Sequence, residues 1–203
     1  MPIGDRILKR MEKLRELRLE YGPLIKLLER NERLRKFMEK RPIIASLIEK
    51  FKPEILEPSD FESKFREDLK IAEKTVLIMS PFVTTKRVND LGDILKEIIA
   101  KGVEVEVQLL DPKHPSIRNK EDHHRAIQTL ENLGVNVEKR MYMHEKAIIV
   151  DNKVAYLGSI NCLSKYSYER KDDYMLRYSH PELVEFIRMN LMTMAEASDR
   201  IPE

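Results

Sequence analysis

A histidine and a lysine two residues apart begin a run of polar residues at fixed spacing in the last third of this 203-residue chain. The segment HEKAIIVDNKVAYLGSIN follows the pattern H-x-K-x(4)-D-x(6)-G-S-x-N, whose defined positions are His144, Lys146, Asp151, Gly158, Ser159 and Asn161. A chance match at all of these positions is much rarer than a chance match to a lone glycine-rich loop. The segment is therefore interpreted as a catalytic site.

Two short apolar segments on either side of Asp151-Asn152 predict a β-hairpin at this site. Residues 144–150 and 153–158 are rich in Ile, Val and Ala, and an Asp-Asn pair suits a tight two-residue turn. Such a turn would pair Lys146 with Leu157. A three-residue loop would shift the register by one residue and remove the convergence that the two-residue turn predicts.

In the two-residue register, four polar side chains share one face of the hairpin. His144 would lie opposite Ser159, while Lys146 and Asn161 continue the same alternation along their strands. Gly158 beside them would let the backbone approach a ligand closely. The hairpin would therefore gather an imidazole, an ammonium, a hydroxyl and an amide on one surface.

This set of groups suits a phosphoryl group better than an acyl group. Lys146 supplies a fixed positive charge, and Ser159 and Asn161 supply neutral donors to phosphate oxygens. His144 can act as a nucleophile or transfer a proton near neutral pH. Because no cluster of carboxylates suited to magnesium accompanies them, the sequence predicts phosphodiester chemistry without a metal or other cofactor.

At these residues the chain resembles the phospholipase D (PLD) superfamily, whose signature is this His-Lys-Asp pattern followed by Gly-Ser-x-Asn. The resemblance implies a two-step mechanism. One histidine attacks phosphorus to give a phosphohistidine, a second histidine protonates the leaving oxygen, and water then releases the intermediate.

The family builds its site from two copies of the motif, but this chain contains one. The remaining histidines, none of which begins a second H-x-K, are at positions 114, 123, 124 and 180. A two-fold homodimer would supply His144 twice, on opposite sides of phosphorus as in-line displacement requires. Single-motif members of the superfamily are mostly nucleases, so the resemblance implies a nuclease with its site across a homodimer.

The resemblance also assigns roles by matched position. His144 is nucleophile or general acid, depending on the subunit, and Lys146, Ser159 and Asn161 bind the phosphate. Asp151 matches the motif's acidic position, but strand alternation turns it away from the phosphate and favours a turn-stabilising or ion-pairing role. The family also uses a downstream acid to orient the histidine ring. The candidates are Glu169, Asp172 and Asp173, and Asp173 is preferred because DYMLRY resembles the strand that carries this acid in some relatives.

Strands alternate with helices from about residue 58 onward, which predicts an α/β domain with a mixed sheet flanked by helices. The expected strands cover residues 75–82, 102–110, 135–138, 144–150, 153–158 and 174–178, and the expected helices cover about 86–101, 122–133 and 181–195. This order matches the PLD superfamily. SPF at 80–82 and GSINCLS at 158–164 resemble the PLD-like domains that accompany some DNA helicases, which implies a helicase-type protein as a further partner.

Residues 1–57 differ in character from residues 58–203, the expected catalytic domain. Residues 1–60 contain 15 Lys and Arg against 11 Asp and Glu, a net charge of +4, which leaves −2 for residues 61–203. Apolar residues at helical spacing predict two or three amphipathic helices, followed by the linker KPEILEPSD. Packing of these helices on the catalytic domain or on a partner subunit is favoured over a nucleic-acid-binding arm.

Composition sets the outer limits of the interpretation. The chain has no apolar run of membrane-spanning length, a charged N-terminus and one cysteine, so we expect a soluble, cytoplasmic protein without disulfides or membrane contact. The net charge of +2 argues against tight, wholly electrostatic DNA binding. Substrate recognition would then need a local patch or a partner protein.

Several other residues allow two interpretations. His123-His124 could bind a metal, but a surface or helix-start role is favoured. Tyr166, Tyr168 and Arg170 could stack on bases or close over the core. Cys162 is interpreted as a small packing residue, and His114 as a turn residue.

The function predicted from the sequence is a metal-independent nuclease acting on nucleic acid, with DNA favoured as the substrate. A phospholipase or phosphatidyl transferase is the alternative within enzymes. A catalytically vestigial module that binds nucleic acid or a helicase is the alternative outside them. The sequence leaves open the choices between DNA and RNA, single and double strands, and endonuclease and exonuclease activity.

Overall fold

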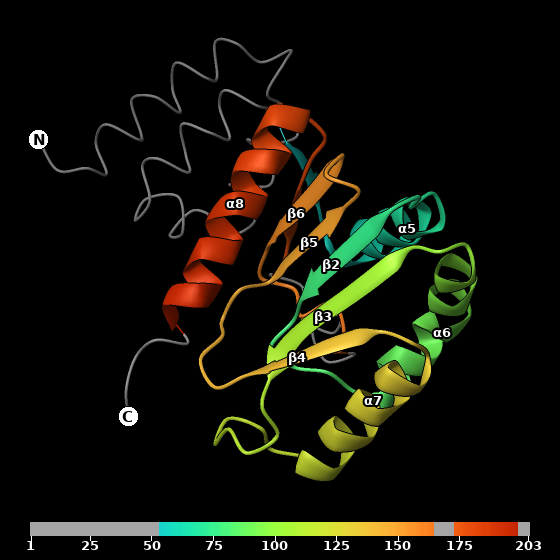
Figure 1. The fold of residues 1–203 in the computed structure, drawn as a ribbon. Coiled ribbons are helices and arrows are strands. Elements are labelled where there is room, and N and C mark those ends of the chain that lie inside the picture. The colour runs from blue at the N-terminus through green and yellow to red at the C-terminus, as the bar shows by residue number, and fades with distance from the viewer. Residues whose placement is uncertain (1–52, 165–172, 199–203) are drawn as a thin grey trace, which may run out of the picture. The chain divides into compact units, whose positions relative to one another are not determined.

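The structure, a computed structural model, describes residues 53–164 and 173–198 (Figure 1). The chain divides into two compact units, residues 1–55 and 56–203. The predicted N-terminal helices lie outside the described residues, so the boundary between a helical region and a catalytic domain stays a prediction. Glu169, Asp172, Tyr166, Tyr168 and Arg170 also lie outside them.

A mixed sheet of seven strands forms the centre of the described structure, which confirms the predicted α/β class. The strands are β1 (Glu54–Leu56), β2 (Thr75–Met79), β3 (Glu104–Leu110), β4 (Asn136–Arg140), β5 (Ala147–Val150), β6 (Val154–Gly158) and β7 (Met175–Tyr178). Their order across the sheet is β1-β7-β6-β5-β2-β3-β4. Strands β2, β3 and β4 are parallel, whereas β5 is antiparallel to β2 and β6, and β6 is antiparallel to β7.

Four helices flank the sheet in the described part of the chain (Figure 1). They are α5 (Pro58–Lys70), α6 (Thr85–Ala100), α7 (Lys120–Asn132) and α8 (Pro181–Ser198). Helices α5, α6 and α7 pack on one face and share the main core cluster with alternate strand residues such as Ile78 and Ile148. Helix α8 buries Leu183, Val184 and Ile187 outside that cluster and packs against β6 on the other face.

Local sequence signals explain the limits of α6 and α7. In α6, the buried residues Val88, Leu91, Leu95 and Ile98 recur every three or four positions and form one apolar face. Helix α7 begins where the Asn119 side chain accepts a hydrogen bond from the backbone N–H of Asp122. Each helix is followed by a glycine with φ +89°, Gly102 after α6 and Gly134 after α7, which ends the helix in the left-handed conformation.

Strand β1 and helix α5 were not predicted, because KPEILEPSD was interpreted as a linker. The segment contains β1 and the start of α5, with Pro58 in the first turn of the helix. Phe61, Phe65 and Leu69, four residues apart, are fully buried. The Phe61 ring stacks on Phe65 at 5.3 Å and meets Tyr156 edge-on at 5.5 Å. This four-residue spacing is the signal that the sequence interpretation missed.

The hairpin turns at Asp151-Asn152, where the backbone N–H of Lys153 donates to the carbonyl of Val150 at 2.9 Å, but the predicted strand register is wrong. Val150 pairs with Val154, so the loop has three residues, Asp151, Asn152 and Lys153, and the register is shifted by one. Asp151 and Asn152 have φ of 53° and 51°, a left-handed pair that Asp and Asn tolerate. As a result the backbone N–H of Gly158 donates to the carbonyl of Lys146 at 3.2 Å, and Lys146 does not pair with Leu157.

Candidate active site

The chemically important residues of the motif lie at one edge of the sheet, despite the shifted register. His144 and Lys146 directly precede β5, Ser159 directly follows β6, and Asp173 lies two residues before β7. Since Met79 at the end of β2 pairs with Ala147, this is also the carboxyl edge of the parallel strands. Ligands of open α/β sheets bind at that edge. The convergence therefore comes from the ends of three antiparallel strands, and not from one face of a two-residue hairpin.

The Lys146 side chain is hydrogen-bonded to the main chain of His144. The Lys146 ammonium donates to the main-chain carbonyl of His144 at 2.7 Å, and the Glu145 carboxylate accepts from the His144 N–H at 2.8 Å. His144 itself is exposed at the surface, whereas Lys146 is half-buried. The lysine side chain thus folds back onto the histidine and holds a positive charge beside the imidazole.

This geometry lowers the pKa of His144 below its usual value of 6.5. The main cause is the positive charge of Lys146, partial burial acts in the same direction, and Glu145 opposes both. A lowered pKa favours the neutral imidazole, which has a lone pair available for attack on an electrophile.

Ser159 and Asp173 form a second polar pair at this edge. The Ser159 hydroxyl donates to the Asp173 carboxylate at 2.8 Å and accepts from the backbone N–H of Tyr174 at 3.1 Å. Asp173 is buried, with 3% of its surface exposed. The structure therefore brings the preferred acid to the serine of the motif.

The loop that carries Asn161 is held by a buried arginine. The Arg87 Nε–H donates to the carbonyl of Cys162 at 2.9 Å, and its two terminal nitrogens bind the Glu62 carboxylate at 2.9 and 2.6 Å. In the same loop, the carbonyl of Leu163 accepts a hydrogen bond from the backbone N–H of Thr84 at 2.9 Å. Arg87 was missed by the sequence interpretation, although an arginine directly before Val88 on the apolar face of α6 is an unusual position.

Gly158 has a packing role that differs from the predicted one. A Cβ atom at this position would lie 2.2 Å from the carbonyl oxygen of Tyr174 and 2.9 Å from the Cα of Met175. The close approach that glycine permits here is therefore to the start of β7, and the approach of a ligand to this backbone stays a prediction.

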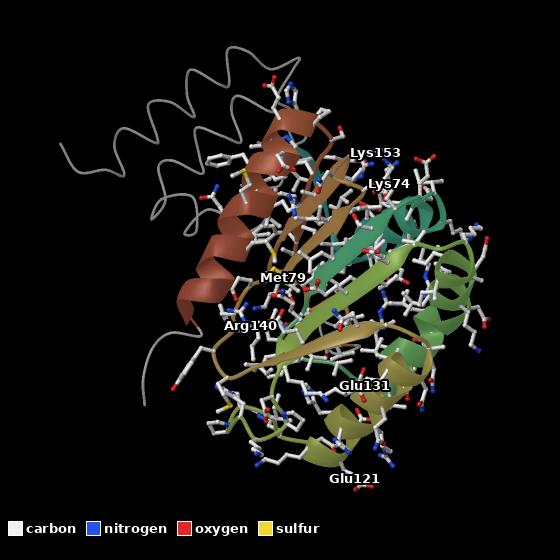
Figure 2. The ribbon with its side chains drawn as sticks, in the orientation of Figure 1. Lys74, Met79, Glu121, Glu131, Arg140 and Lys153 are labelled. Carbon is white, nitrogen blue, oxygen red and sulfur yellow. The ribbon has the colours of Figure 1, made fainter. Side chains whose placement is uncertain are left out.

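Asp151 lies at the opposite end of β5 from Lys146. Its carboxylate accepts hydrogen bonds from the backbone N–H groups of Glu73, Lys74 and Thr75 at 2.8, 2.7 and 2.9 Å. Figure 2 shows Lys74 and Lys153 together at this end of the hairpin. Partial burial alone would raise the pKa of Asp151, but the three backbone donors outweigh it and lower the pKa. Asp151 therefore joins the hairpin turn to β2, a structural role remote from His144.

Three residues considered for other roles are placed as follows. His123 is buried in the first turn of α7, where its Nε2 lies 2.8 Å from the carbonyl oxygen of Leu110 and burial lowers its pKa. Of the two favoured positions, His123 therefore has the one at the helix start and not the one at the surface. Cys162 is buried, which raises the pKa of its thiol to about 12. The Nδ1 of His114 accepts from the backbone N–H of Ser116 at 3.2 Å, within a turn.

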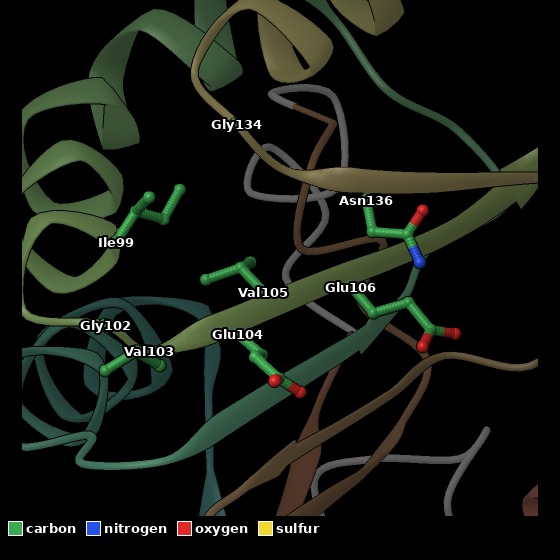
Figure 3. Close-up of a pocket in the computed structure, with 8 residues that line it drawn as sticks. All are labelled: Ile99, Gly102, Val103, Glu104, Val105, Glu106, Gly134 and Asn136. Carbon is green, nitrogen blue, oxygen red and sulfur yellow. The ribbon is translucent and has the colours of Figure 1, made fainter.

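A pocket lies at the opposite end of the strands from the motif (Figure 3). It has a volume of about 390 Å³ and is lined by Ile99, Gly102, Val103, Glu104, Val105, Glu106, Gly134 and Asn136. These residues lie at the amino ends of β3 and β4 and include no part of the motif. The pocket is therefore separate from the candidate active site.

Residues 53–164 and 173–198 contain no group of three or more His, Cys, Asp or Glu arranged to hold a metal ion. Within the same ranges, no helix combines the length and apolar character that crossing a bilayer requires.

Comparison with known proteins identifies the family. Residues 65–194 match the family model described as "Cardiolipin synthase, PLD-like domain". The match covers more than half of the chain and contains the whole motif, so the chain belongs to this PLD-like family. A search of curated protein sequences found no match.

Solved structures share the fold at low sequence identity. Nuc from Salmonella typhimurium, described as a phospholipase D family member, is 17% identical, with a TM-score of 0.57 over 73% of this chain and 97% of that one. NucT from Helicobacter pylori is 19% identical, with a TM-score of 0.54 over 70% of this chain and 94% of that one. Phosphatidylserine synthase from Haemophilus influenzae is 12% identical, with a TM-score of 0.51 over 66% of this chain and 34% of that one. These likenesses confirm the PLD-like fold.

Proposed function

We propose that the protein is a metal-independent phosphodiesterase that hydrolyses nucleic acid through a phosphohistidine on His144. The observation that carries the proposal is the ammonium of Lys146 folded against His144, which lowers the pKa of the imidazole and supplies the cation that a phosphate needs. The hydrogen-bonded pair of half-buried Ser159 and buried Asp173 at the same sheet edge supports it. The chain thus provides a neutral nucleophile and a fixed positive charge from its own side chains.

The proposed reaction has two displacements at phosphorus. A ring nitrogen of His144 forms a bond to phosphorus as the bond to the leaving oxygen breaks, and His144 of the partner subunit gives that oxygen a proton. Water then attacks the phosphohistidine and loses a proton to the same partner histidine, which frees His144 and leaves a phosphomonoester. Attacking and leaving groups must be in line, so the two histidines must stand on opposite sides of phosphorus.

The remaining polar residues have proposed roles in binding and positioning. Lys146 neutralises the non-bridging phosphate oxygens, and Asn161 donates to them. Ser159 can donate to phosphate only by releasing its bond to Asp173, so it either binds substrate or positions that carboxylate. Asp173 is proposed to hold the histidine ring in its working orientation, as the family resemblance implies.

The test is cleavage of labelled DNA and RNA strands in excess EDTA. Wild type should cut at least one of them, and His144→Ala should lose at least about a hundredfold in rate, the usual scale for removing a proton-transfer or nucleophilic group. His124→Ala is the matched control, because His124 is an exposed helix residue without a proposed role. Cutting that needs added metal, or that survives in His144→Ala, would contradict the proposal.

Phosphatidyl transfer is the second candidate, and the family description that names cardiolipin synthase is the observation that favours it. The same phosphohistidine chemistry would then act on a lipid phosphodiester. Turnover of phosphatidylglycerol in mixed micelles, lost in His144→Ala and accompanied by no cutting of nucleic acid, would select this candidate. Nucleic-acid binding without turnover of either substrate would select a vestigial binding module.

A further inference from the structure

Two loops leave the sheet side by side at the edge where the motif lies. The backbone N–H of Asp111, just after β3, donates to the carbonyl of Arg140, the last residue of β4, at 2.8 Å. The loop from β3 to α7 and the loop from β4 to β5 therefore start from adjacent positions (Figure 1). The second of these loops leads directly to His144.

The loop from β3 to α7 is positively charged. Residues 112–120 contain Lys113, His114, Arg118 and Lys120 but no carboxylate. Lys113, Arg118 and Lys120 are exposed, and none of them forms an ion pair with any residue in the described ranges. The nearest acids in the chain are engaged elsewhere, since Asp111 accepts from the backbone N–H of Lys113 at 2.7 Å and Glu121 pairs with Arg125 at 3.4 Å.

The loop from β4 to β5 exposes an aromatic ring next to the nucleophile. Tyr142 is 49% exposed and Met141 is 43% exposed, whereas most large apolar side chains of the described structure are buried. Tyr142 precedes His144 by two residues, which span at most about 7 Å of chain. A phosphate at His144 would therefore place a neighbouring base within reach of the ring.

Given phosphodiester chemistry at His144, on which this inference rests, we infer that the two loops form a binding track for single-stranded nucleic acid. Tyr142 stacks on a base beside the scissile phosphate, and Lys113, Arg118 and Lys120 contact the phosphates that follow. An unpaired base offers a free face for stacking, whereas the bases of a duplex are already stacked within it. Residues 61–203 carry a net charge of −2, so contact with duplex phosphates alone would bind weakly.

Tyr142 is tested with two single strands that differ only in their bases. One is an ordinary labelled oligonucleotide, and the other carries abasic spacers around the cut site, which keep the phosphates and remove the bases. Wild type should bind and cut the ordinary strand better than the abasic strand. Tyr142→Ala should reduce this preference by roughly fivefold to a hundredfold, the effect of losing one stack, and Tyr142→Phe should restore it.

The cations are tested with a matched set of charge changes. The triple variant Lys113→Gln, Arg118→Gln, Lys120→Gln should weaken single-strand binding and reduce the slope of log K against log salt by about two. The control is the triple variant Lys70→Gln, Lys74→Gln, Lys96→Gln, which removes the same charge. These three lysines are exposed and lie on α5, before β2 and on α6, respectively. The control should leave binding and salt dependence as in wild type.

The outcomes separate this inference from the proposed function. If His144-dependent cutting is found but wild type treats ordinary and abasic strands alike, the track is wrong and the phosphodiesterase stands. If cutting is absent, fluorescence anisotropy with the same strands still tests the track. Tighter binding of duplex than of single strand, or a Tyr142→Ala effect on subunit association in place of strand binding, would overturn it.

Discussion

At the residue scale, the proposed reaction depends on how Lys146 changes the chemistry of His144. A histidine nucleophile must be neutral, and a positive charge beside it disfavours the protonated form. The hydrogen bond from the Lys146 ammonium to the His144 carbonyl keeps that charge in place beside the histidine. One lysine can therefore both prepare the nucleophile and attract the phosphate.

The coupling between the two residues predicts a pH dependence. The lowered pKa of His144 places the acid limb of kcat/KM below pH 6.5, because the attacking imidazole must be unprotonated. Lys146→Met removes the positive charge and should raise the pKa of His144, as followed by NMR titration of the imidazole protons. Lys153→Met, at the far end of the same hairpin, should leave that titration unchanged. A lower pKa in Lys146→Met would contradict the electrostatic account.

Asp173 gives a second prediction at this scale. Asp173→Asn keeps an oxygen that can accept from Ser159 but removes the negative charge, so the fold should persist while kcat falls by at least about tenfold. Asp173→Glu should recover part of the loss. Unchanged kcat and an unchanged pH profile in Asp173→Asn, with normal thermal stability, would show that this carboxylate does not act on the histidine.

At the element scale, the hairpin is fixed by its turn and by β2. Asp151 accepts from three successive backbone amides before and at the start of β2, and its own backbone N–H donates to the Thr75 carbonyl at 2.8 Å. These bonds fasten the three-residue loop to β2 through Asp151. The acidic position of the motif thus maintains the geometry of β5, which delivers Lys146 to the other edge.

Asp151→Ala should lower the free energy of unfolding by about 1–3 kcal/mol at neutral pH, because three amides lose a charged acceptor and the left-handed turn loses a residue that tolerates it. Since the pKa of Asp151 is lowered in the folded state, its contribution is present above the ordinary pKa of 3.8 and is lost as pH falls through the lower folded value. Urea unfolding at several pH values measures this difference. Equal destabilisation at pH 7 and well below pH 3 would contradict the assigned role of the carboxylate.

The elements also show what could be predicted from the sequence. Helix α6 and strands β2 and β3 could be predicted from the spacing of their apolar residues. Packing between the helix and the sheet buries residues at regular intervals, and this spacing is visible in the sequence. The register of the hairpin could not be predicted, since the Asp-Asn pair is compatible with a two-residue or a three-residue loop, and Asp151 also bonds to a strand more than seventy residues away in the sequence. Arg87 was missed for a similar reason, because its partners Glu62 and Cys162 are distant in sequence.

At the scale of the whole molecule, one motif per chain is the main constraint on function. The residues of the described site supply one nucleophilic histidine and one ammonium, whereas two in-line displacements need a second acid on the far side of phosphorus. A two-fold axis beside His144 would complete the site. The single motif indicates that a second subunit would supply the other histidine. The sequence of one chain does not show where that subunit binds.

A site shared between two subunits, as proposed, predicts a quadratic loss of activity in mixed dimers. When wild type is reassembled with increasing amounts of His144→Ala, only dimers with two wild-type subunits keep a complete site. Activity should therefore follow the square of the wild-type fraction, with light scattering confirming the dimer. Mixing with His124→Ala should leave activity constant. A linear decrease with His144→Ala would mean that each subunit works alone.

The stereochemical course at phosphorus tests the phosphohistidine mechanism most directly. The substrate is a strand whose scissile phosphate carries one sulfur in a single configuration, hydrolysed in isotopically labelled water, and the configuration of the product is determined. Two in-line displacements, first by His144 and then by water, predict net retention of configuration. Net inversion would show a single direct attack by water and would contradict a covalent role for His144.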